Sequence, residues 1–232
     1  MTDQEFLQHE RQWTLRAVVL LGGYYGAYTY LARGGVFANA QTGNLVMLAA
    51  AVGQLNWYRV LMLLIPITAF GCGTAISECL NRKFASFGRL RLESYLILLE
   101  IFLVVLIGFI PHSVPDQIAQ SILNFICSMQ YNTFRQADGE PMAARFCVNH
   151  VRTMAINIVR SRCDLDAHAA RVWRDHLAML LMFIGGGALA AVACKYYDIR
   201  AIWGALVLQC VILSHLWHAI IVKKRALKRE NV

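Results

Sequence analysis

Long apolar runs separated by short polar segments make up most of this chain. Most of the runs are about 18 to 22 residues long, and a helix of that length can cross a hydrocarbon core of roughly 30 Å. We predict six spans, at residues 15–32, 57–80, 94–111, 117–134, 176–195 and 201–222. The pattern therefore predicts an all-α integral membrane protein with six spanning helices.

Two further apolar segments are too short or too interrupted to be spans. In segment 34–53 the apolar part follows Thr42, and segment 139–159 contains Arg145, His150 and Arg152. About ten helical residues rise roughly 15 Å, which is half of the hydrocarbon core. We therefore predict two short broken or re-entrant helices, the first of which starts near Thr42 and ends at about Val52.

The composition favours the membrane class and argues against nucleic-acid binding. Of the 232 residues, 58% are hydrophobic and only 16% are charged, whereas a soluble domain usually has about a quarter charged residues. The net charge is +8, but no basic face with interleaved aromatic residues is present, as nucleic-acid binding would require. We expect the basic residues to set the topology and to meet anionic lipid.

Basic residues in the short loops predict the orientation in the membrane. Lys and Arg are frequent in segments 82–91, 135–174 and 223–229, whereas loop 112–116 contains neither. Because cytoplasmic loops are enriched in basic residues, we predict a cytoplasmic N-terminal segment (1–13), a basic cytoplasmic tail (223–232) and an external loop 112–116.

The two halves of the chain share a layout. A shift of 106 positions places the segment 37–45 on 143–151, and glycine clusters follow at 71–73 and 185–187. We predict a first repeat at 14–111 and a second at 112–222, each with three spans and one re-entrant segment. Because three is odd, the second repeat must be inverted relative to the first, as in many secondary transporters.

The motifs of both halves resemble those of a known family. Residues 34–45, Gly-Gly-Val-Phe-Ala-Asn-Ala-Gln-Thr-Gly-Asn-Leu, resemble the Gly-x-Phe-x-x-x-x-Thr-Gly-Asn signature of the YoaK-like bacterial membrane proteins. Met-Gln-Tyr-Asn at 129–132 resembles the Gln-Asn stretch that opens the second half in that family. Where the family repeats Thr-Gly-Asn, this chain has Val148, Asn149 and His150. The resemblance implies a multi-pass protein of the bacterial inner (plasma) membrane, and it supplies no substrate.

A helix that starts inside the membrane points unpaired N–H groups and a partial positive charge at whatever lies before it. We predict Thr42 as the N-cap and Gly43 as a point of close backbone approach. The candidate site for a polar or anionic solute comprises Asn39, Gln41, Thr42, Gly43, Asn44, Gln130, Asn132, Arg145 and His150. In the alternative interpretation, Thr42 and Asn44 only cap a helix and pack a re-entrant loop.

Glu100 is the one carboxylate well inside a predicted span. An ionised acid there is costly, so it should be protonated, paired or in contact with water. We consider it a candidate for proton coupling, with a structural pairing to a basic or amide group as the alternative. Glu78 lies near the end of its span and should pair with Arg82 one helical turn later.

No metal or cofactor is expected. The seven cysteines include no Cys-x-x-Cys pair, and His215 and His218 have no second ligand pair at comparable depth. The cysteines are better explained as small buried thiols than as a disulfide framework or a zinc site. The glycine clusters should allow helices to cross closely.

Three classes of function are open. The repeat, the broken helices and the buried polar residues favour a small secondary transporter or channel-like permease. A non-catalytic membrane scaffold or sensor subunit is the alternative. An intramembrane enzyme is disfavoured because the chain has no His-Glu-x-x-His, Gly-x-Ser-x-Gly or paired-acid motif. The partners we expect are the lipid bilayer and a small polar or anionic solute, with a homodimer as an option.

Overall fold

The computed structural model describes residues 3–83, 89–134, 136–137, 140–141 and 147–230, and within these ranges the chain is almost entirely helical. The α-helices are α1 (Asp3–Ala32), α2 (Gln41–Gly53), α3 (Trp57–Lys83), α4 (Arg89–Ile107), α5 (Asp116–Thr133), α6 (Cys147–Cys163), α7 (Ala167–Tyr197) and α8 (Gly204–Glu230). A 3₁₀ helix, η2 (Asp198–Trp203), precedes α8, and β1 (Gln136–Ala137) pairs with β2 (Glu140–Pro141). The predicted all-helical class is confirmed.

Two helical stretches of the described chain are long and apolar enough to cross a membrane. They are Trp57–Lys83, which is α3, and Ala167–Val222, which runs through α7, η2 and α8. The other predicted spans also coincide with helices, but their composition is mixed. Helix α4 carries the charged residues Arg91, Glu93 and Glu100 near its apolar run, and glycines and tyrosines interrupt the apolar residues of α1. Six spans therefore remain a prediction.

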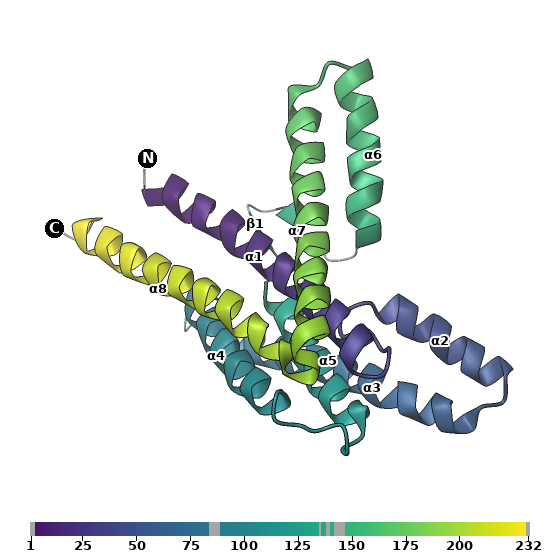
Figure 1. Ribbon diagram of the computed structural model, residues 1–232. Coiled ribbons are helices and arrows are strands. Elements are labelled where there is room, and N and C mark those ends of the chain that lie inside the picture. Colours follow the sequence, from purple (N-terminus) through teal and green to yellow (C-terminus); the bar gives the residue numbers. More distant parts are fainter. Residues whose placement is uncertain (1–2, 84–88, 135, 138–139, 142–146, 231–232) are drawn as a thin grey trace.

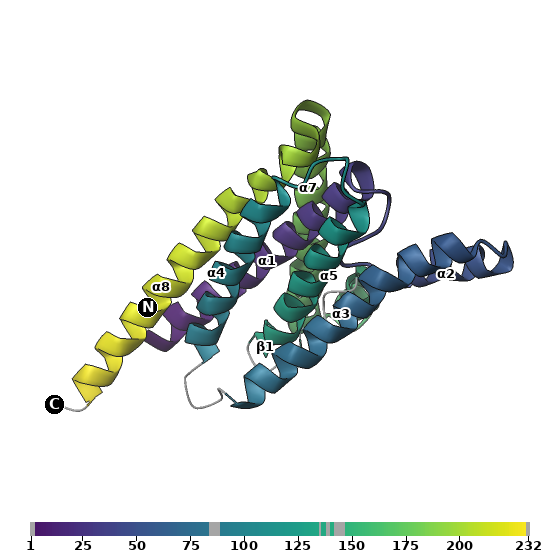
Figure 2. The same cartoon turned by 90° about the horizontal axis from the view of Figure 1, so that it is seen from below.

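The helices of the two halves are interleaved. Helix α1 packs along α7, α3 packs along α5, and α4 packs along α8. Two hairpins project from this bundle (Figure 1): α2 with the first part of α3, and α6 with the first part of α7. In the second view (Figure 2), α1, α4, α5 and α8 run side by side while α2 extends away from them.

Glycines allow the closest helix crossings. A Cβ at Gly73 of α3 would collide with the carbonyl of Phe125 in α5, and a Cβ at Gly186 of α7 would collide with the carbonyl of Leu20 in α1. The expectation of close crossings at both glycine clusters is thus confirmed. Gly71 and Gly185 have open space around the Cβ position, and a Cβ at Gly187 would make only ordinary van der Waals contact with α1.

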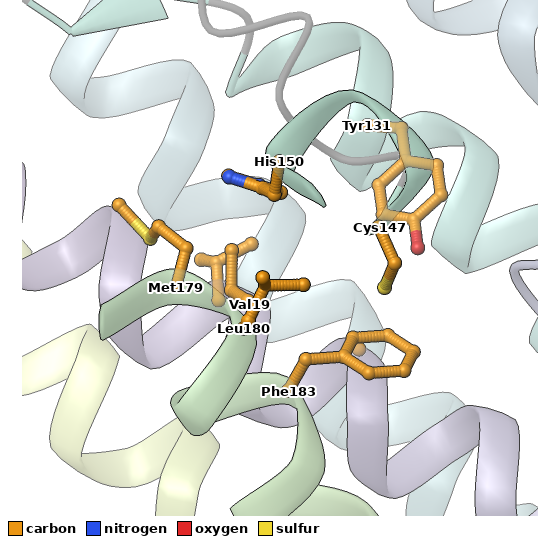
Figure 3. A pocket seen from close by; sticks show the side chains of 9 residues that line it. Val19, Tyr131, Cys147, His150, Met179, Leu180 and Phe183 are labelled. Carbon is orange, nitrogen blue, oxygen red and sulfur yellow. The ribbon is translucent and has the colours of Figure 1, made fainter. Parts of the chain in front are cut away.

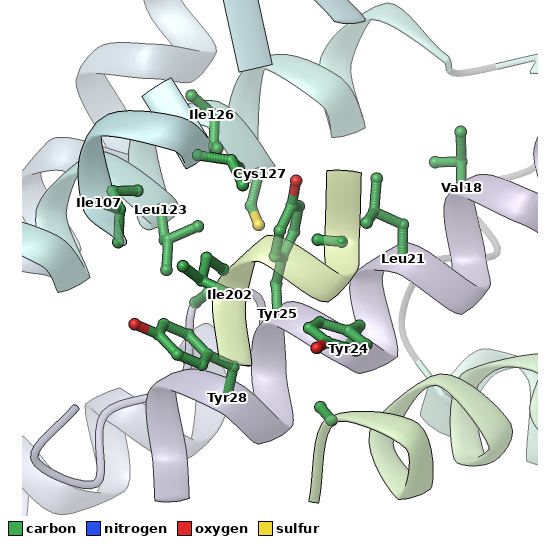
Figure 4. Packing of buried hydrophobic residues seen from close by; sticks show 14 of the residues in the cluster. Val18, Leu21, Tyr24, Tyr25, Tyr28, Ile107, Leu123, Ile126, Cys127 and Ile202 are labelled. Carbon is green, nitrogen blue, oxygen red and sulfur yellow. The ribbon is translucent and has the colours of Figure 1, made fainter. Parts of the chain in front are cut away.

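The buried core lies where α1, α4, α5 and α8 meet (Figure 4). Tyrosines of α1 occupy its centre, and their hydroxyl groups reach backbone carbonyls: Tyr24 donates to Ala201 at 2.5 Å, and Tyr28 donates to Ile199 at 2.8 Å. A buried tyrosine needs such a partner for its hydroxyl group. These bonds tie α1 to η2 and so fix the position of α1 within the bundle.

Candidate functional site

The chain after α1 turns back along that helix. Gly34 and Gly35 adopt φ angles of 70° and 76°, a left-handed conformation that glycine adopts at no steric cost. The returning segment is held by Asn39, whose Nδ2 donates to the carbonyl of Gly22 at 2.5 Å, and by Ala38, whose N–H donates to Thr29 Oγ1 at 3.0 Å. As a result α2 starts beside the middle of α1 rather than beyond its end.

Asn44 holds this returning loop in place. Its Nδ2 donates to the carbonyl of Phe37 at 2.8 Å, and its Oδ1 accepts from the N–H of Phe37 at 2.9 Å. Gln41 accepts a third bond from Asn44 and donates to Asn124 Oδ1 of α5 at 2.6 Å. Asn44, to which the alternative interpretation gave a packing role, and Gln41 therefore both make contacts within the protein.

The short helix is where the sequence predicts it, but Thr42 is not its N-cap. Helix α2 covers Gln41–Gly53, its N-cap is Ala40, and no side chain caps it. The prediction for Thr42 was wrong because the helical bonding already begins at the carbonyl of Ala40, which accepts from Gly43 and Asn44. Asn44 organises the preceding loop instead. Gly43 was expected to allow a close approach of the backbone. In the structure it lies close to the ring of Phe37, an aromatic side chain.

The starts of the two short helices lie on one cleft. The cleft has a volume of about 480 Å³, and its wall includes Asn39 and Thr42 from the first motif and Cys147 and Val148 from the second. The described residues of the wall also include small residues of α1 and α7 and four aromatic rings, those of Tyr30, Phe37, Tyr131 and Phe183. The cleft is therefore mainly apolar and aromatic, with few polar groups near the helix starts.

His150 occupies in α6 the place of Asn44 in α2. Helix α6 begins at Cys147 and α2 at Gln41, and both His150 and Asn44 are buried. His150 Nδ1 lies 2.9 Å from Nδ1 of His176 in α7. Burial, and then the neighbouring His176, lower the pKa of His150 from its ordinary value of 6.5 to about 4. His150 is therefore neutral at physiological pH.

A second, much smaller pocket lies next to His150 (Figure 3). Figure 3 shows Cys147 and Tyr131 on one side of it, Met179 on the other and Phe183 below. Cys147, Tyr131 and Phe183 also line the larger cleft, so the two hollows are adjacent. Within the described part of the chain, no group of three His, Cys, Asp or Glu side chains is placed to hold a metal ion.

Gln130 and Asn132 are not among the described residues that line the cleft. Gln130 donates to Glu100 Oε2 at 3.1 Å, in the core of the bundle. Asn132 donates to Glu78 Oε2 at 3.3 Å, and Glu78 accepts from Arg82 at 3.0 Å, which confirms the predicted pair. Arg145 lies outside the described residues.

A polar cluster that sequence reasoning missed lies at one end of α1. Arg33 is fully buried, its Nη2 donates to the carbonyls of Ile107 and Ile110 at 3.2 and 2.8 Å, and its Nη1 lies 3.5 Å from Asp116. Gln120 Nε2 donates to the carbonyl of Arg33 at 2.5 Å. The sequence feature that could have indicated this cluster is the pair of amides Gln120 and Asn124, which lie one turn apart inside a predicted span.

Comparisons with known proteins place the chain in a family but give it no activity. No curated protein and no solved structure matches it. A family model described as "Protein of unknown function (DUF1275)" matches residues 14–215. Because that match covers most of the sequence, the chain belongs to the DUF1275 family of proteins of unknown function.

Proposed function

We propose that this protein is a small permease of the bacterial inner membrane, and that its solute binds in the cleft where α2 and α6 begin. The observation that carries the proposal is the wall of that cleft, which takes Thr42 from one helix start and Val148 from the other. The start of a helix carries unpaired N–H groups and a partial positive charge, so a cleft bordered by two helix starts suits an anionic solute.

The helix pairings fit the proposed inverted repeat, which in turn supports this function. The pairing of α1 with α7 has a counterpart in the pairing of α5 with α3, and the α2–α3 hairpin has one in the α6–α7 hairpin. The turns of both hairpins contain a leucine with positive φ, 55° at Leu55 and 51° at Leu165, which is unusual for this residue type. Both pairings also depend on glycines: Gly73 at the α3–α5 crossing, and Gly23 together with Gly186 at the α1–α7 crossing. Inverted repeats place substrate sites at the repeat interface.

A six-span arrangement, with α2 and α6 as re-entrant helices, fits the grouping of the loops. Both ends of the described chain lie at the same end of the bundle (Figures 1 and 2). At the other end, His112 lies 2.6 Å from Asp198. We assign the first end to the cytoplasm because its loops are basic. The mixed composition of α1 and α5 is reasonable, since helices inside a bundle meet little lipid.

The wall of the cleft narrows the solute class. A volume of about 480 Å³ suits a small metabolite. The side chains of Asn39 and Thr42 and the helix starts offer polar contacts at one place, whereas rings such as those of Phe37 and Phe183 offer an apolar surface. The solute that fits is a small organic anion, such as a carboxylate, with an apolar or aromatic body.

Uptake by proteoliposomes tests the proposal. We expect the wild-type protein to take up one or more members of a panel of small aliphatic and aromatic carboxylates. Ile184→Trp, which fills the cleft from α7, should reduce uptake at least tenfold. Leu181→Trp is the matched control, because Leu181 is exposed on the same helix but is not among the lining residues. Equal uptake by both variants, or none by wild type, would overturn the proposal.

Thr42→Val tests the polar end of the cleft. We expect it to raise the KM for the carboxylate several-fold, because one hydroxyl donor is lost while the shape is kept. Thr68→Val makes the same change on an exposed face of α3, where the hydroxyl group only donates to the carbonyl of Ile65, and should leave KM unchanged. An unchanged KM in Thr42→Val would remove that residue from the site.

A further inference from the structure

A buried carboxyl group joins the helices of both halves. Glu100 of α4 is fully buried, and its Oε2 lies 3.1 Å from Nε2 of Gln130 in α5 and 3.5 Å from Nε2 of Gln209 in α8. Gln209 Nε2 also donates to the hydroxyl of Tyr25 in α1 at 2.8 Å. One residue from each of four helices thus meets at this point.

The hydrogen bonding at this junction is incomplete. Glu100 Oε1 and the side-chain oxygen of Gln209 are buried and accept no hydrogen bond. Both unmet groups are acceptors, so the cluster lacks a hydrogen-bond donor. Among the described residues no cation pairs with Glu100, and an ionised carboxylate buried without a cation is very costly.

We propose that Glu100 is a proton-binding site and that its neutral, protonated form holds the four helices together. When a proton binds to Oε1 of Glu100, this oxygen becomes a hydrogen-bond donor. The side-chain oxygen of Gln209 can then accept the hydrogen bond that it otherwise lacks. When Glu100 is deprotonated, the proton leaves as H⁺ and no other covalent bond is formed or broken. A proton needs no added volume, which suits a site enclosed by the packed core of Figure 4. The inference goes beyond the permease proposal, because it holds for any solute.

Among the described residues, no competing base surrounds Glu100. The titratable groups that face it are the hydroxyl of Tyr25 on α1 and the thiol of Cys127 on α5, which are weak acids. Helix α8 presents the amide of Gln209, and on α4 itself the next acid, Glu93, lies about two turns away. The proton at this junction therefore belongs to Glu100.

Infrared spectroscopy of the purified protein in lipid nanodiscs tests the proposal without any transport assay. We expect a carbonyl-stretch band of an unhydrated carboxylic acid at neutral pH, absent in Glu100→Gln and lost as the pH is raised. Glu78→Gln should keep the band, since Glu78 is partly exposed beside Arg82. Absence of the band in wild type at neutral pH, or its persistence in Glu100→Gln, would overturn the proposal.

Two further measurements keep the proposal testable. The first applies if Glu100→Gln does not fold, and the second asks whether Glu100 binds a metal cation in place of a proton. Gln209→Leu keeps the acid and removes an amide acceptor, so it should shift the band of Glu100 to higher frequency, and an unshifted band would contradict the proposed bond. Sodium chloride should stabilise the wild-type protein against heat no more than choline chloride does. A sodium-specific increase in Tm that Glu100→Gln abolishes would replace the proton by a sodium ion.

Discussion

At the scale of single residues, Asn44 and His150 lie at the same position of two different short helices but make different kinds of contact. Both are buried at the fourth residue of a short helix. The amide of Asn44 donates to and accepts from the backbone of Phe37 in the loop before its own helix. The imidazole of His150 instead lies against His176 of the next helix. The first half therefore uses this position to hold a loop, and the second half uses it to join α6 to α7.

Asn44→Ala should destabilise the protein. The change removes the partners of both backbone groups of Phe37, and a buried polar group without a partner costs roughly 1–3 kcal/mol. We expect a clearly lower Tm in a thermal unfolding assay in detergent. Asn157→Ala is the control, because its amide donates only to the carbonyl of Thr153 one turn earlier in α6. Equal Tm values for the two variants would contradict the role given to Asn44.

His150 should make stability depend on pH. Its pKa is about 4 in the folded protein against an ordinary value of 6.5, so between these values the unfolded chain binds more protons than the folded one. Stability should therefore be full above about pH 6.5 and fall as the pH drops toward 4. His150→Asn should weaken this fall, whereas His168→Asn, at an exposed position, should not. Identical pH profiles for wild type and His150→Asn would refute the assignment.

At the scale of elements, the fold depends on two helix crossings that lack side chains at the contact. Gly73 lets α3 approach α5, and Gly186 lets α7 approach α1. Without a strong hydrophobic driving force between helices in lipid, close backbone packing of this kind holds a membrane bundle together. The crossings also set where the starts of α2 and α6 lie, because each short helix is in a hairpin with α3 or α7.

Gly73→Ala and Gly186→Ala should both destabilise the bundle. In each case the new methyl group meets backbone atoms of the facing helix, and overpacking typically costs about 1–3 kcal/mol. Gly71→Ala and Gly185→Ala are matched controls in open space. They should be neutral or slightly stabilising, since alanine favours a helix by up to about 1 kcal/mol. Thermal unfolding of all four variants in detergent measures the difference, and a similar Tm in every variant would contradict the packing role.

At the scale of the whole molecule, ion pairs join residues that lie far apart in the sequence. Arg16, near the middle of α1, pairs with Asp175 of α7, whereas His112, in the loop after α4, lies against Asp198 at the start of η2. Arg33, directly after α1, pairs with Asp116 at the start of α5 and donates to the carbonyl of Ile110 in the loop after α4. These contacts connect α1, α4 and α5. The loop predicted to be external, 112–116, thus lies at the end of the bundle opposite the two ends of the described chain.

Cysteine labelling in intact cells tests the predicted orientation. In a cysteine-free background, Ser113→Cys should react with a membrane-impermeant maleimide, whereas Lys83→Cys should react only after the cells are permeabilised. The expectation follows from the basic residues near Lys83 and their absence from loop 112–116. Labelling of both positions from the same side would contradict the six-span arrangement and, with it, the inverted repeat.

Features that depend on neighbouring residues could be predicted from the amino-acid sequence. The all-helical class, the short helix ending near Val52 and the pair of Glu78 and Arg82 all follow from periodicity, segment length and contacts one turn apart. These features could be predicted because helical hydrogen bonds close within four residues.

Which polar groups meet depends on how distant helices pack in the tertiary structure. Gln130 was expected beside Asn39, yet it bonds to Glu100 in the core, and the cleft takes Tyr131 from the next position instead. His176 appeared only as the first residue of a span, although it is the partner of His150. Adjacent helix residues point about 100° apart, so the packing of distant helices decides which one faces the cleft. Local pattern cannot supply that choice, because the contacts that settle it join residues far apart in the chain.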